Sequence, residues 1–520
     1  MIQCRSLFIR TVAVLLLISV FVTACGNQLW GSYDPLLTAT PAVFWTLAPT
    51  ATLPSPTATQ PPATETPPAP TETSTPPGPT PTPRPPILYY SQSGDSLDVV
   101  ARHFGVEVGE ITSANPLPQT GLLNPDTPLV IPNRLGETTP GERTIPDSEV
   151  VFSPSAVNFN ISAFVADQGG YLTAYRQYLG RSGWNTGAEL IQRAATDNSI
   201  NPRLLLALIE YQSGWVRGQP SNLSVTDYPL GYVDLQYRGL LRQMVQAIQD
   251  LSIGYYGWRG GTLTEVTFLD GTTLRISPNL NAGTVAIQYY FARHYAYDDW
   301  VRIINPQVGF PALSAELFGD PWVRAQTVEP LFPPGLTQPA MSLPFERGTA
   351  WSYSGGPHPA WDTEGPLAAL DFAPPSVDSG CVPSSQWIVA VAPGLVVRSG
   401  LGVVILDTDG DGYEQTGWDL LYLHVSTDGR VPVGTWMDNN DWIGHPSCEG
   451  GTATGTHVHI ARKYNGEWVL ADGPLAFTLS GWVAHAGANP YQGTLTRDGE
   501  VVIARATGTH ETRILRSVND

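Results

Sequence analysis

The sequence has few basic residues, and this shortage excludes one large class of function. Lysine and arginine together number 27, against 46 aspartates and glutamates, so the formal net charge is −19. Sequence-independent binding of nucleic acid relies on lysine and arginine to neutralise phosphates, so we exclude nucleic acid as a partner. At 520 residues the chain is long enough for several domains, each with its own core.

An apolar run near the start of the chain has the features of an export signal. Two arginines precede the run over residues 11–22, which is too short for a transmembrane helix of about 20 residues. The next letters, "VTAC", resemble the lipobox of bacterial lipoproteins. That resemblance implies a signal peptide over residues 1–24 and a lipid on the thiol of Cys25. The alternative is an ordinary secretory signal cleaved near Ala24, and both readings place the mature protein outside the cytoplasm.

Cysteine is also scarce, with only four in the chain. Cys4 leaves with the signal and Cys25 is the predicted lipid anchor, so Cys381 and Cys448 remain. An oxidising compartment favours a disulfide between these two thiols. A zinc site built on them would need further ligands at suitable spacing, and the sequence has none near them.

Residues 25–86 contain the anchor and a segment dominated by proline, threonine and alanine. Such a composition lacks the apolar residues needed to bury a core. It predicts a polyproline-like spacer that reaches up to about 3.1 Å per residue and lifts the following domains away from the membrane.

Residues 87–135 have the pattern of a small α+β module. The sequence predicts a strand, a turn, a helix with Leu97, Val100 and Phe104 on its apolar face, a second helix ending near Asn115, and a closing strand "PLVIP". The tyrosines before "SGDSL", the "VARHFGV" helix and the final "LVIP" resemble the LysM family. This resemblance implies recognition of glycan that contains N-acetylglucosamine.

Residues 150–312 have apolar side chains at helical spacing and predict an α-helical domain. The segment "NPRLLLALIEYQSGW" resembles the lysozyme-like lytic transglycosylases, in which a catalytic glutamate stands immediately before Ser-Gly. Gln212 occupies that position here and cannot protonate a glycosidic oxygen. Glu210 lies two residues earlier, about 200° around the helix, and is a poor substitute. We therefore expect this lysozyme-like domain to be non-catalytic.

Residues 346–505 change character to short apolar strands separated by glycine and proline turns, and a tail follows over 506–520. This pattern predicts an all-β domain of sandwich or barrel type. Six of the nine histidines fall in it. In "GTHVHI", His457 and His459 occupy alternate positions among β-branched residues, so a strand would place both on one face. A shared face favours metal binding or proton transfer, and two half-buried histidines of a hairpin are the alternative.

Two further stretches have the same chemistry. "GGPHPAWDTEGPLAALDFAPP" contains His358 and Asp371, and "LLYLHVS" contains His424. With "GTHVHI", in this order, they resemble the lysostaphin-type zinc endopeptidases, which cut peptidoglycan cross-links and have a duplicated hybrid motif fold. The interval of thirteen between His358 and Asp371 resembles the beta-lytic branch.

The resemblance implies one Zn²⁺ ion held by His358, Asp371 and His459, with water in the fourth position. Catalytic zinc takes three such ligands and leaves one site open. His424 and His457 match the two histidines that do not bind the metal; these would move a proton and stabilise charge on the attacked carbonyl oxygen. Their separate roles stay open.

Three other candidates are weaker. Asp362 would fit a shorter His-x-x-x-Asp spacing, but only Asp371 has the aromatic, small residue and proline of the family after it. His445 is expected to be structural. The stretch "DTDGDGYE", residues 407–414, is similar to a calcium loop, yet Trp418 stands where an EF-hand needs glutamate, so a tight acidic hairpin is expected.

The sequence therefore predicts a multidomain protein outside the cytoplasm, anchored to the cell membrane by a lipid and facing the cell wall. Its predicted activity is zinc-dependent hydrolysis of peptide cross-links in bacterial peptidoglycan, with the LysM module binding the glycan. The alternative is a non-catalytic wall-binding protein that regulates or activates other wall hydrolases.

Overall fold

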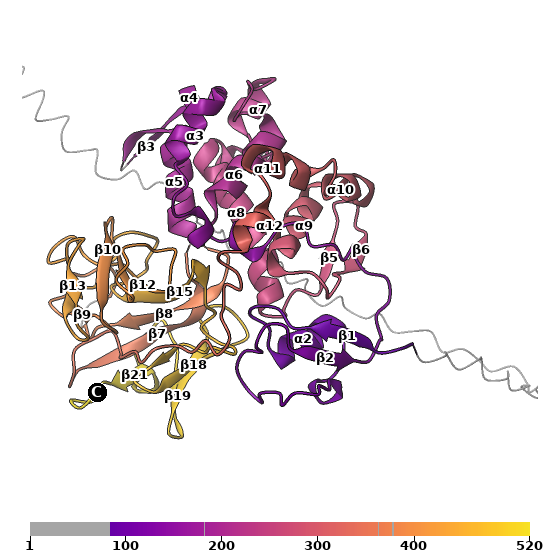
Figure 1. Ribbon diagram of the computed structural model, residues 1–520. Helices are drawn as coiled ribbons and strands as arrows, with labels where there is room; N and C mark the ends of the chain where they lie inside the picture. The colour runs from indigo at the N-terminus through magenta and orange to yellow at the C-terminus, as the bar shows by residue number, and fades with distance from the viewer. Residues whose placement is uncertain (1–83, 181, 362, 377–378) are drawn as a thin grey trace, which may run out of the picture. The chain divides into compact units, whose positions relative to one another are not determined.

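The computed structural model describes residues 84–520, apart from 181, 362 and 377–378 (Figure 1). The signal segment, Cys25 and most of the proline-rich segment lie outside the described residues and stay predictions. Among the residues that are described, we find no helix with both the length and the apolar character needed to cross a membrane. The described chain contains a small α+β region, a helical region and a β region, in that order.

The small region forms around two paired strands and one helix. Strand β1 (Ile87–Tyr90) pairs antiparallel with β2 (Pro128–Ile131), and α2 (Leu97–Phe104) packs its buried side chains on them. The helix begins where the Ser96 side chain accepts a hydrogen bond from the Val99 amide, and it ends at Gly105, which has a φ of 66°. A serine N-cap and a left-handed glycine are the usual helix boundaries.

The second helix predicted for this region is wrong. Only the single 3₁₀ turn η1 (Val108–Glu110) forms there. Two residues later, the Thr112 amide donates to the Val130 carbonyl at 3.1 Å, and the Val130 amide donates back to Thr112 at 2.8 Å. Pairing with β2 satisfies these backbone groups and therefore replaces a continued helix.

The helical region surrounds α6 (Pro202–Ser213), whose residues Leu204 to Ile209 are all buried. Helix α8 (Leu240–Arg259) packs along α9 (Ala282–His294), and a Cβ on Gly254 would meet the Cα of Ala286 at 2.8 Å. Glycine at this position therefore permits the close approach of the two helices. The predicted α-helical character of this region is confirmed. The remaining elements are η2 (Asp147–Glu149), η3 (Pro154–Ala156), α3 (Ile161–Gln168), α4 (Tyr171–Ala174), β3 (Arg176–Leu179), β4 (Gly183–Thr186), α5 (Gly187–Asn198), α7 (Leu223–Asp227), η4 (Leu235–Tyr237), β5 (Glu265–Thr267), β6 (Thr273–Arg275), α10 (Tyr297–Ile303), α11 (Phe310–Phe318) and α12 (Pro321–Ala325).

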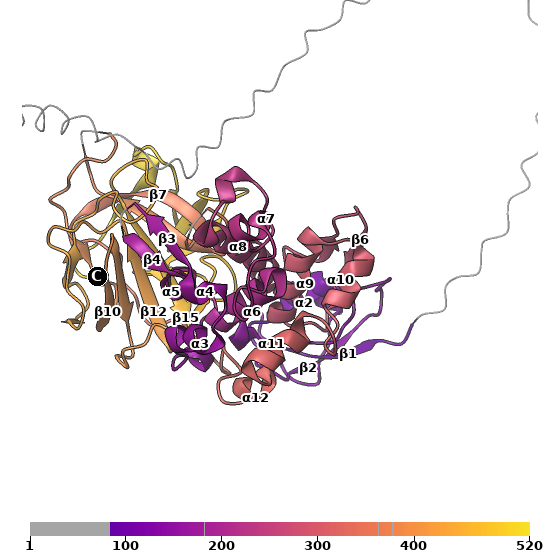
Figure 2. The same ribbon diagram turned by 90° about the horizontal axis from the view of Figure 1, so that it is seen from above.

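The β region contains a nine-stranded antiparallel sheet in the order β13-β10-β11-β12-β15-β8-β7-β21, with β16 paired to β15, and a four-stranded sheet β17-β18-β19-β20. Figure 2 shows β10, β12 and β15 of the larger sheet in that order. The all-β prediction is confirmed. The strands are β7 (Ala350–Pro359), β8 (Leu367–Ala373), β9 (Ile388–Val389), β10 (Gly394–Gly400), β11 (Val403–Asp407), β12 (Trp418–Leu423), β13 (Trp436–Met437), β14 (Trp442–Gly444), β15 (Val458–Tyr464), β16 (Glu467–Trp468), β17 (Thr478–Leu479), β18 (Trp482–Ala486), β19 (Gly493–Arg497), β20 (Glu500–Ile503) and β21 (Arg513–Leu515), with the 3₁₀ turn η5 (His510–Thr512) before the last.

Both faces of the central strands are buried. Val458 and Ile460 of β15 belong to the core of the β region, whereas Ala461 belongs to the same hydrophobic cluster as the helical residues. The indole nitrogen of Trp468 donates to the carbonyl of Asn198 at the end of α5, at 3.2 Å. The helical region therefore packs against one face of the sheet, which explains why these strands are apolar without alternation.

A buried ion cluster joins the helical region to the sheet. The Arg259 guanidinium of α8 lies 2.8 Å from the Asp147 carboxylate and 2.8 Å from that of Glu467 on β16. The Tyr255 hydroxyl also donates to Glu467, at 2.7 Å. The three charged side chains are at most 8% exposed. Each charge in this cluster therefore depends on the others for compensation.

Removal of the Glu467 carboxylate should destabilise the protein strongly. Glu467→Ala leaves the Arg259 guanidinium buried with one partner fewer, and we expect a loss of about 3–5 kcal/mol in the free energy of unfolding. Urea denaturation followed by tryptophan fluorescence measures it. The control Glu511→Ala removes an ion pair with Arg505, whose side chains are 51% and 57% exposed, and should change nothing measurable. Equal effects of the two substitutions would contradict a structural role for the cluster.

Candidate metal centre

Three neighbouring strands bring His358, Asp371 and His459 together. Asp371 of β8 is the direct cross-strand partner of His459 of β15, and His358 lies near the end of β7, the next strand. A Cβ at Gly355 of β7 would meet the Asp371 Oδ2 atom at 2.5 Å. Glycine therefore leaves the room that the Asp371 carboxylate occupies.

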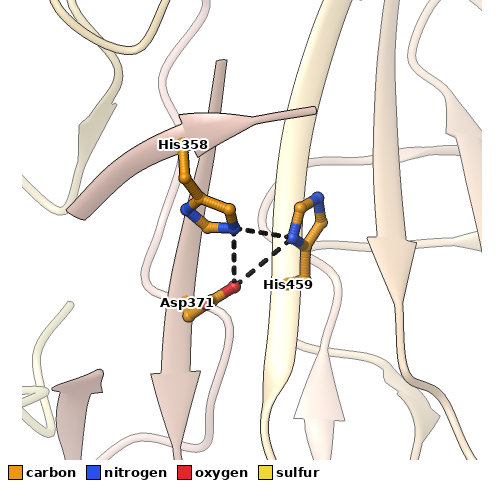
Figure 3. A group of neighbouring side chains, drawn as sticks. All are labelled: His358, Asp371 and His459. Carbon is orange, nitrogen blue, oxygen red and sulfur yellow. Dashed lines mark hydrogen bonds and ion pairs between the residues drawn. The ribbon is translucent and has the colours of Figure 1, made fainter. Parts of the chain in front are cut away.

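The facing atoms of these three side chains form a tight triangle, drawn in Figure 3. His358 Nε2 lies 2.9 Å from His459 Nδ1 and 3.2 Å from Asp371 Oδ1, and His459 Nδ1 lies 3.4 Å from the same oxygen. All three residues are buried, and they could hold a metal ion.

The outer nitrogens of the two histidines determine what the inner atoms can do. His358 Nδ1 donates to the Gly356 carbonyl at 2.7 Å, and His459 Nε2 donates to the Ala360 carbonyl at 3.0 Å. In the neutral rings the inner nitrogens therefore present lone pairs to each other and to Asp371 Oδ1, a buried atom with no hydrogen-bond partner. A shared proton would satisfy one of these contacts, whereas a metal ion accepts all three lone pairs. The donor set of two imidazoles and a carboxylate fits zinc.

The charges in the triangle reinforce this arrangement. Burial alone would raise the pKa of Asp371, but the facing His358 and His457 hold that pKa well below its usual range. The carboxylate is therefore ionised and available as a ligand at neutral pH.

His424 and His457 lie beside the triangle. Their ring centroids are 4.4 Å apart, and His457 Nε2 lies 3.7 Å from Asp371 Oδ1. His424 Nδ1 donates to the Glu449 carbonyl at 2.8 Å, and His457 Nδ1 donates to Gly455 at 2.7 Å. Each ring therefore keeps its Nε2 free of these backbone contacts.

His424 has a strained backbone and a strongly shifted pKa. It follows β12 directly and has a φ of 66°, which is rare for a residue with a side chain. Burial, together with the neighbouring His457 and His459, lowers the pKa of His424 to about 3. Its ring is therefore neutral at pH 7. His457 precedes β15, which begins at Val458, so it faces Asp371 from just outside the strand.

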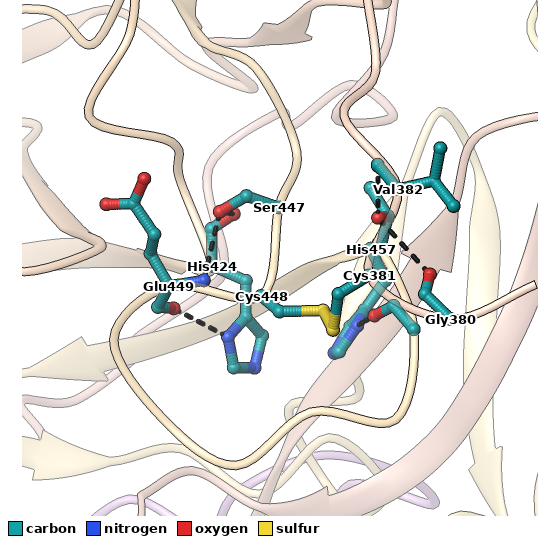
Figure 4. The surroundings of a disulfide bond; sticks show 10 residues. Gly380, Cys381, Val382, His424, Ser447, Cys448, Glu449 and His457 are labelled. Carbon is teal, nitrogen blue, oxygen red and sulfur yellow. Dashed lines mark hydrogen bonds between the residues drawn. A yellow bond between two sulfur atoms is a disulfide. The ribbon is translucent and has the colours of Figure 1, made fainter. Parts of the chain in front are cut away.

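The predicted disulfide between Cys381 and Cys448 is confirmed, with Cα atoms 5.8 Å apart (Figure 4). Next to Cys448, the Ser447 amide donates to the His424 carbonyl at 2.7 Å. Near Cys381, the Val382 carbonyl accepts the Thr456 hydroxyl at 2.6 Å. The bridge therefore links the segments that adjoin His424 and His457.

The other candidates have structural partners. His445 Nδ1 donates to the Gln386 carbonyl at 2.8 Å, which agrees with its expected structural role. The Glu210 carboxylate accepts the Val216 and Arg217 amides at 3.0 Å each, and the Gln212 amide bonds two tyrosine hydroxyls. Glu210 therefore binds the backbone of the segment that follows α6. Asp362 lies outside the described residues.

The sequence patterns did not predict a role for Tyr491 at this site. Its ring stacks on that of His358, with centroids 4.2 Å apart, and its carbonyl accepts the Gly356 amide at 2.9 Å. Tyr491 thus covers one side of the triangle and holds the segment that orients His358. No motif surrounds it in the sequence, so only its place in the fold identifies it.

Comparison with known families matches two parts of the chain. Residues 143–331 match the family described as LasA, N-terminal domain, and residues 92–132 match the LysM domain. The LysM resemblance is confirmed. The helical region is similar to the LasA N-terminal domain, and its likeness to lysozyme-like transglycosylases stays a prediction.

Curated relatives are also similar to part of the chain. Protease LasA of Pseudomonas aeruginosa is 27% identical over 292 residues, which are 53% of this chain and 65% of LasA. The beta-lytic metalloendopeptidase of Lysobacter enzymogenes is 26% identical over 166 residues, which are 32% of this chain and 88% of the relative. The chain thus spans about two thirds of the length of LasA, and its resemblance to the beta-lytic peptidases is confirmed.

Solved structures also align with part of the chain. A structure described as the M23 metalloprotease pseudoalterin from the deep sea aligns over 33% of this chain and 96% of its own, with 24% identity and a TM-score of 0.27. The catalytic domain of lysostaphin from Staphylococcus simulans aligns over 24% of this chain and 89% of its own, with 22% identity and a TM-score of 0.18.

Loss of the disulfide should weaken the β region. The bond joins residues 67 positions apart, and closing such a loop stabilises the folded state by about 4 kcal/mol in the chain-entropy account. We therefore expect Cys381→Ser with Cys448→Ser to lower the thermal unfolding midpoint. Calorimetry with and without reductant measures this; the reductant should lower the midpoint of the wild type and leave the double variant unchanged. A reductant-insensitive wild type would argue against the bond.

Proposed function

We propose that this protein is a zinc-dependent endopeptidase that hydrolyses peptide cross-links of bacterial peptidoglycan. The observation that carries the proposal is the triangle of His358 Nε2, Asp371 Oδ1 and His459 Nδ1, in which three lone-pair donors face one another without a proton for each contact. The similarity of part of the chain to a beta-lytic metalloendopeptidase supports the same reaction class.

The roles of the surrounding residues follow from their partners. A zinc ion held by the triangle would act as a Lewis acid and would lower the pKa of a bound water to about 7. His424 makes its backbone hydrogen bond through Nδ1, so its Nε2 is placed to exchange a proton with the attacking water and with the leaving amine. His457 lies close enough to the same centre to share this work and to donate to a developing oxyanion.

The rest of the chain would bring the active site to its substrate. We propose that the LysM module binds the glycan strands and raises the local concentration of cross-links. The lipid predicted on Cys25 would anchor the protein to the cell membrane, and the proline-rich segment would carry the domains toward the wall. The site of action is then extracytoplasmic.

Substitution of the proposed aspartate ligand should remove zinc. We expect Asp371→Asn to lower the bound zinc from one ion per chain to well below that and to abolish hydrolysis, because the carboxylate charge in the triangle is lost. Metal analysis after dialysis measures the zinc content. Asp362→Asn is the matched control for the alternative ligand, and it should keep its zinc. Loss of zinc from Asp362→Asn alone would reverse the assignment.

The two neighbouring histidines should matter for turnover rather than for zinc. We expect His424→Ala and His457→Ala each to retain one zinc ion and to lower peptide release from purified peptidoglycan by about 10²-fold or more, the usual contribution of acid-base catalysis. Mass spectrometry of the released fragments identifies the cleaved bond.

His459→Ala, and wild-type protein treated with a zinc chelator, should release no peptide. Peptide release that survives both would contradict the proposal. A wild type that binds wall and zinc but cuts nothing would support the regulatory alternative, and fragments with anhydro-sugar ends would indicate transglycosylase chemistry.

A further inference from the structure

A cluster of carboxylates lies at the end of the central strands that is opposite the candidate metal centre. Asp407 ends β11, and Asp409 and Asp411 follow it in the loop to β12. One oxygen from each of these three carboxylates lies within 4.8 Å of the others. Oxygens bound to one calcium ion at 2.3–2.6 Å can be no more than about 5.2 Å apart, so the spacing is compatible with a single ion.

The paired strand adds a fourth carboxylate with no partner. Asp419 of β12 lies directly opposite Asp407 in the β11–β12 register, so both side chains are on the same face of the sheet. Asp419 is fully buried, and neither of its oxygens has a hydrogen-bond partner. A buried carboxylate without a donor is costly, and it requires a compensating charge.

The two basic side chains near Asp419, Lys463 and Arg398, form ion pairs with Glu414. Lys463 Nζ lies 3.2 Å from Glu414 Oε2, and Arg398 Nε lies 2.8 Å from Glu414 Oε1. Arg398 also pairs with Asp197 of the helical region, at 2.8 Å. The four aspartates from 407 to 419 thus form no ion pair with these two cations within 4.0 Å, although Lys463 is the cross-strand neighbour of Asp419.

The loop has the spacing that calcium loops use. Aspartates occupy its first, third and fifth positions, and Gly412 occupies the sixth with a φ of 91°. An EF-hand takes its last carboxylate from the twelfth position. Trp418 stands there in this chain, which argued against a calcium loop in the sequence. In the fold the next residue, Asp419, supplies a carboxylate on the face of Asp407.

We propose that residues 407–419 bind one calcium ion through the carboxylates of Asp407, Asp409 and Asp411, with the buried carboxylate of Asp419 adding negative charge on the same face. All donors are oxygens, which excludes a preference for zinc, and the loop members Asp409 and Asp411 are exposed, which leaves positions open for water. The ion would compensate Asp419 and clamp the ends of β11 and β12. Strand β12 leads directly to His424 and pairs with β15, which carries His459, so calcium would stabilise the strands beside the zinc site.

Terbium, a luminescent substitute for calcium, tests the site in the full chain. The Trp436 ring lies close to Gly410 in this loop, because a Cβ there would meet it at 2.8 Å. Tryptophan excitation should therefore produce terbium emission that saturates and that added calcium reverses. We also expect calcium, but not an equal concentration of potassium, to raise the thermal unfolding midpoint by several degrees.

Substitutions in the loop test whether terbium and calcium bind there. Asp411→Asn changes an exposed residue that should not affect folding, and we expect it to weaken terbium binding at least tenfold and to remove the calcium-induced shift. Asp419→Asn should do the same and retain a cooperative transition. Asp498→Asn removes an equal charge from the exposed turn between β19 and β20 and should respond like the wild type.

His459→Ala distinguishes the calcium site from the zinc site, because loss of a zinc ligand should leave the terbium and calcium responses unchanged. The proposal is wrong if wild-type protein gives neither terbium emission nor a calcium shift. It is also wrong if Asp411→Asn responds like the wild type, or if His459→Ala loses the response, which would place the ion at the triangle instead.

Discussion

The antiparallel register of β11, β12, β15 and β8 fixes where the side chains of the candidate metal centre and of the acidic loop lie. It places His459 opposite Asp371 on one side and opposite Leu423, the residue before His424, on the other. The same register places Asp407 opposite Asp419 at the far end of these strands. A shift of one residue would turn every one of these side chains to the other face. One set of backbone pairings therefore positions both Asp371 with His459 and Asp407 with Asp419.

That register is held because both faces of the sheet are buried. One face contributes Val458 and Ile460 to the core of the β region, and the other contributes Ala461 to the core shared with the helices. The Arg259 and Glu467 pair adds a directional contact at the same boundary. The helical region thus supports the sheet. Its resemblance to lysozyme-like enzymes would require a glutamate as general acid at the position of Gln212.

Local patterns in the sequence predicted much of the fold. The helix over 97–104 has a serine N-cap and a closing glycine, and the short apolar strands of residues 346–505 are separated by glycine and proline turns. The prediction of a second helix in the LysM module was wrong because Thr112 pairs with Val130, a contact between residues far apart in the sequence. Local propensity could not anticipate such a pairing, which competes for the same backbone groups.

The residue types in the sequence predicted the chemistry of the candidate site: two imidazoles and a carboxylate suited to a metal ion, two further histidines, and two cysteines able to form a disulfide. Which of their atoms face one another depends on the fold. The carbonyls of Gly356 and Ala360 orient the histidine rings, Tyr491 covers His358, and Asp419 reaches the acidic loop from a neighbouring strand. These contacts join residues that strand pairing brings together, and a linear pattern contains no distance between them.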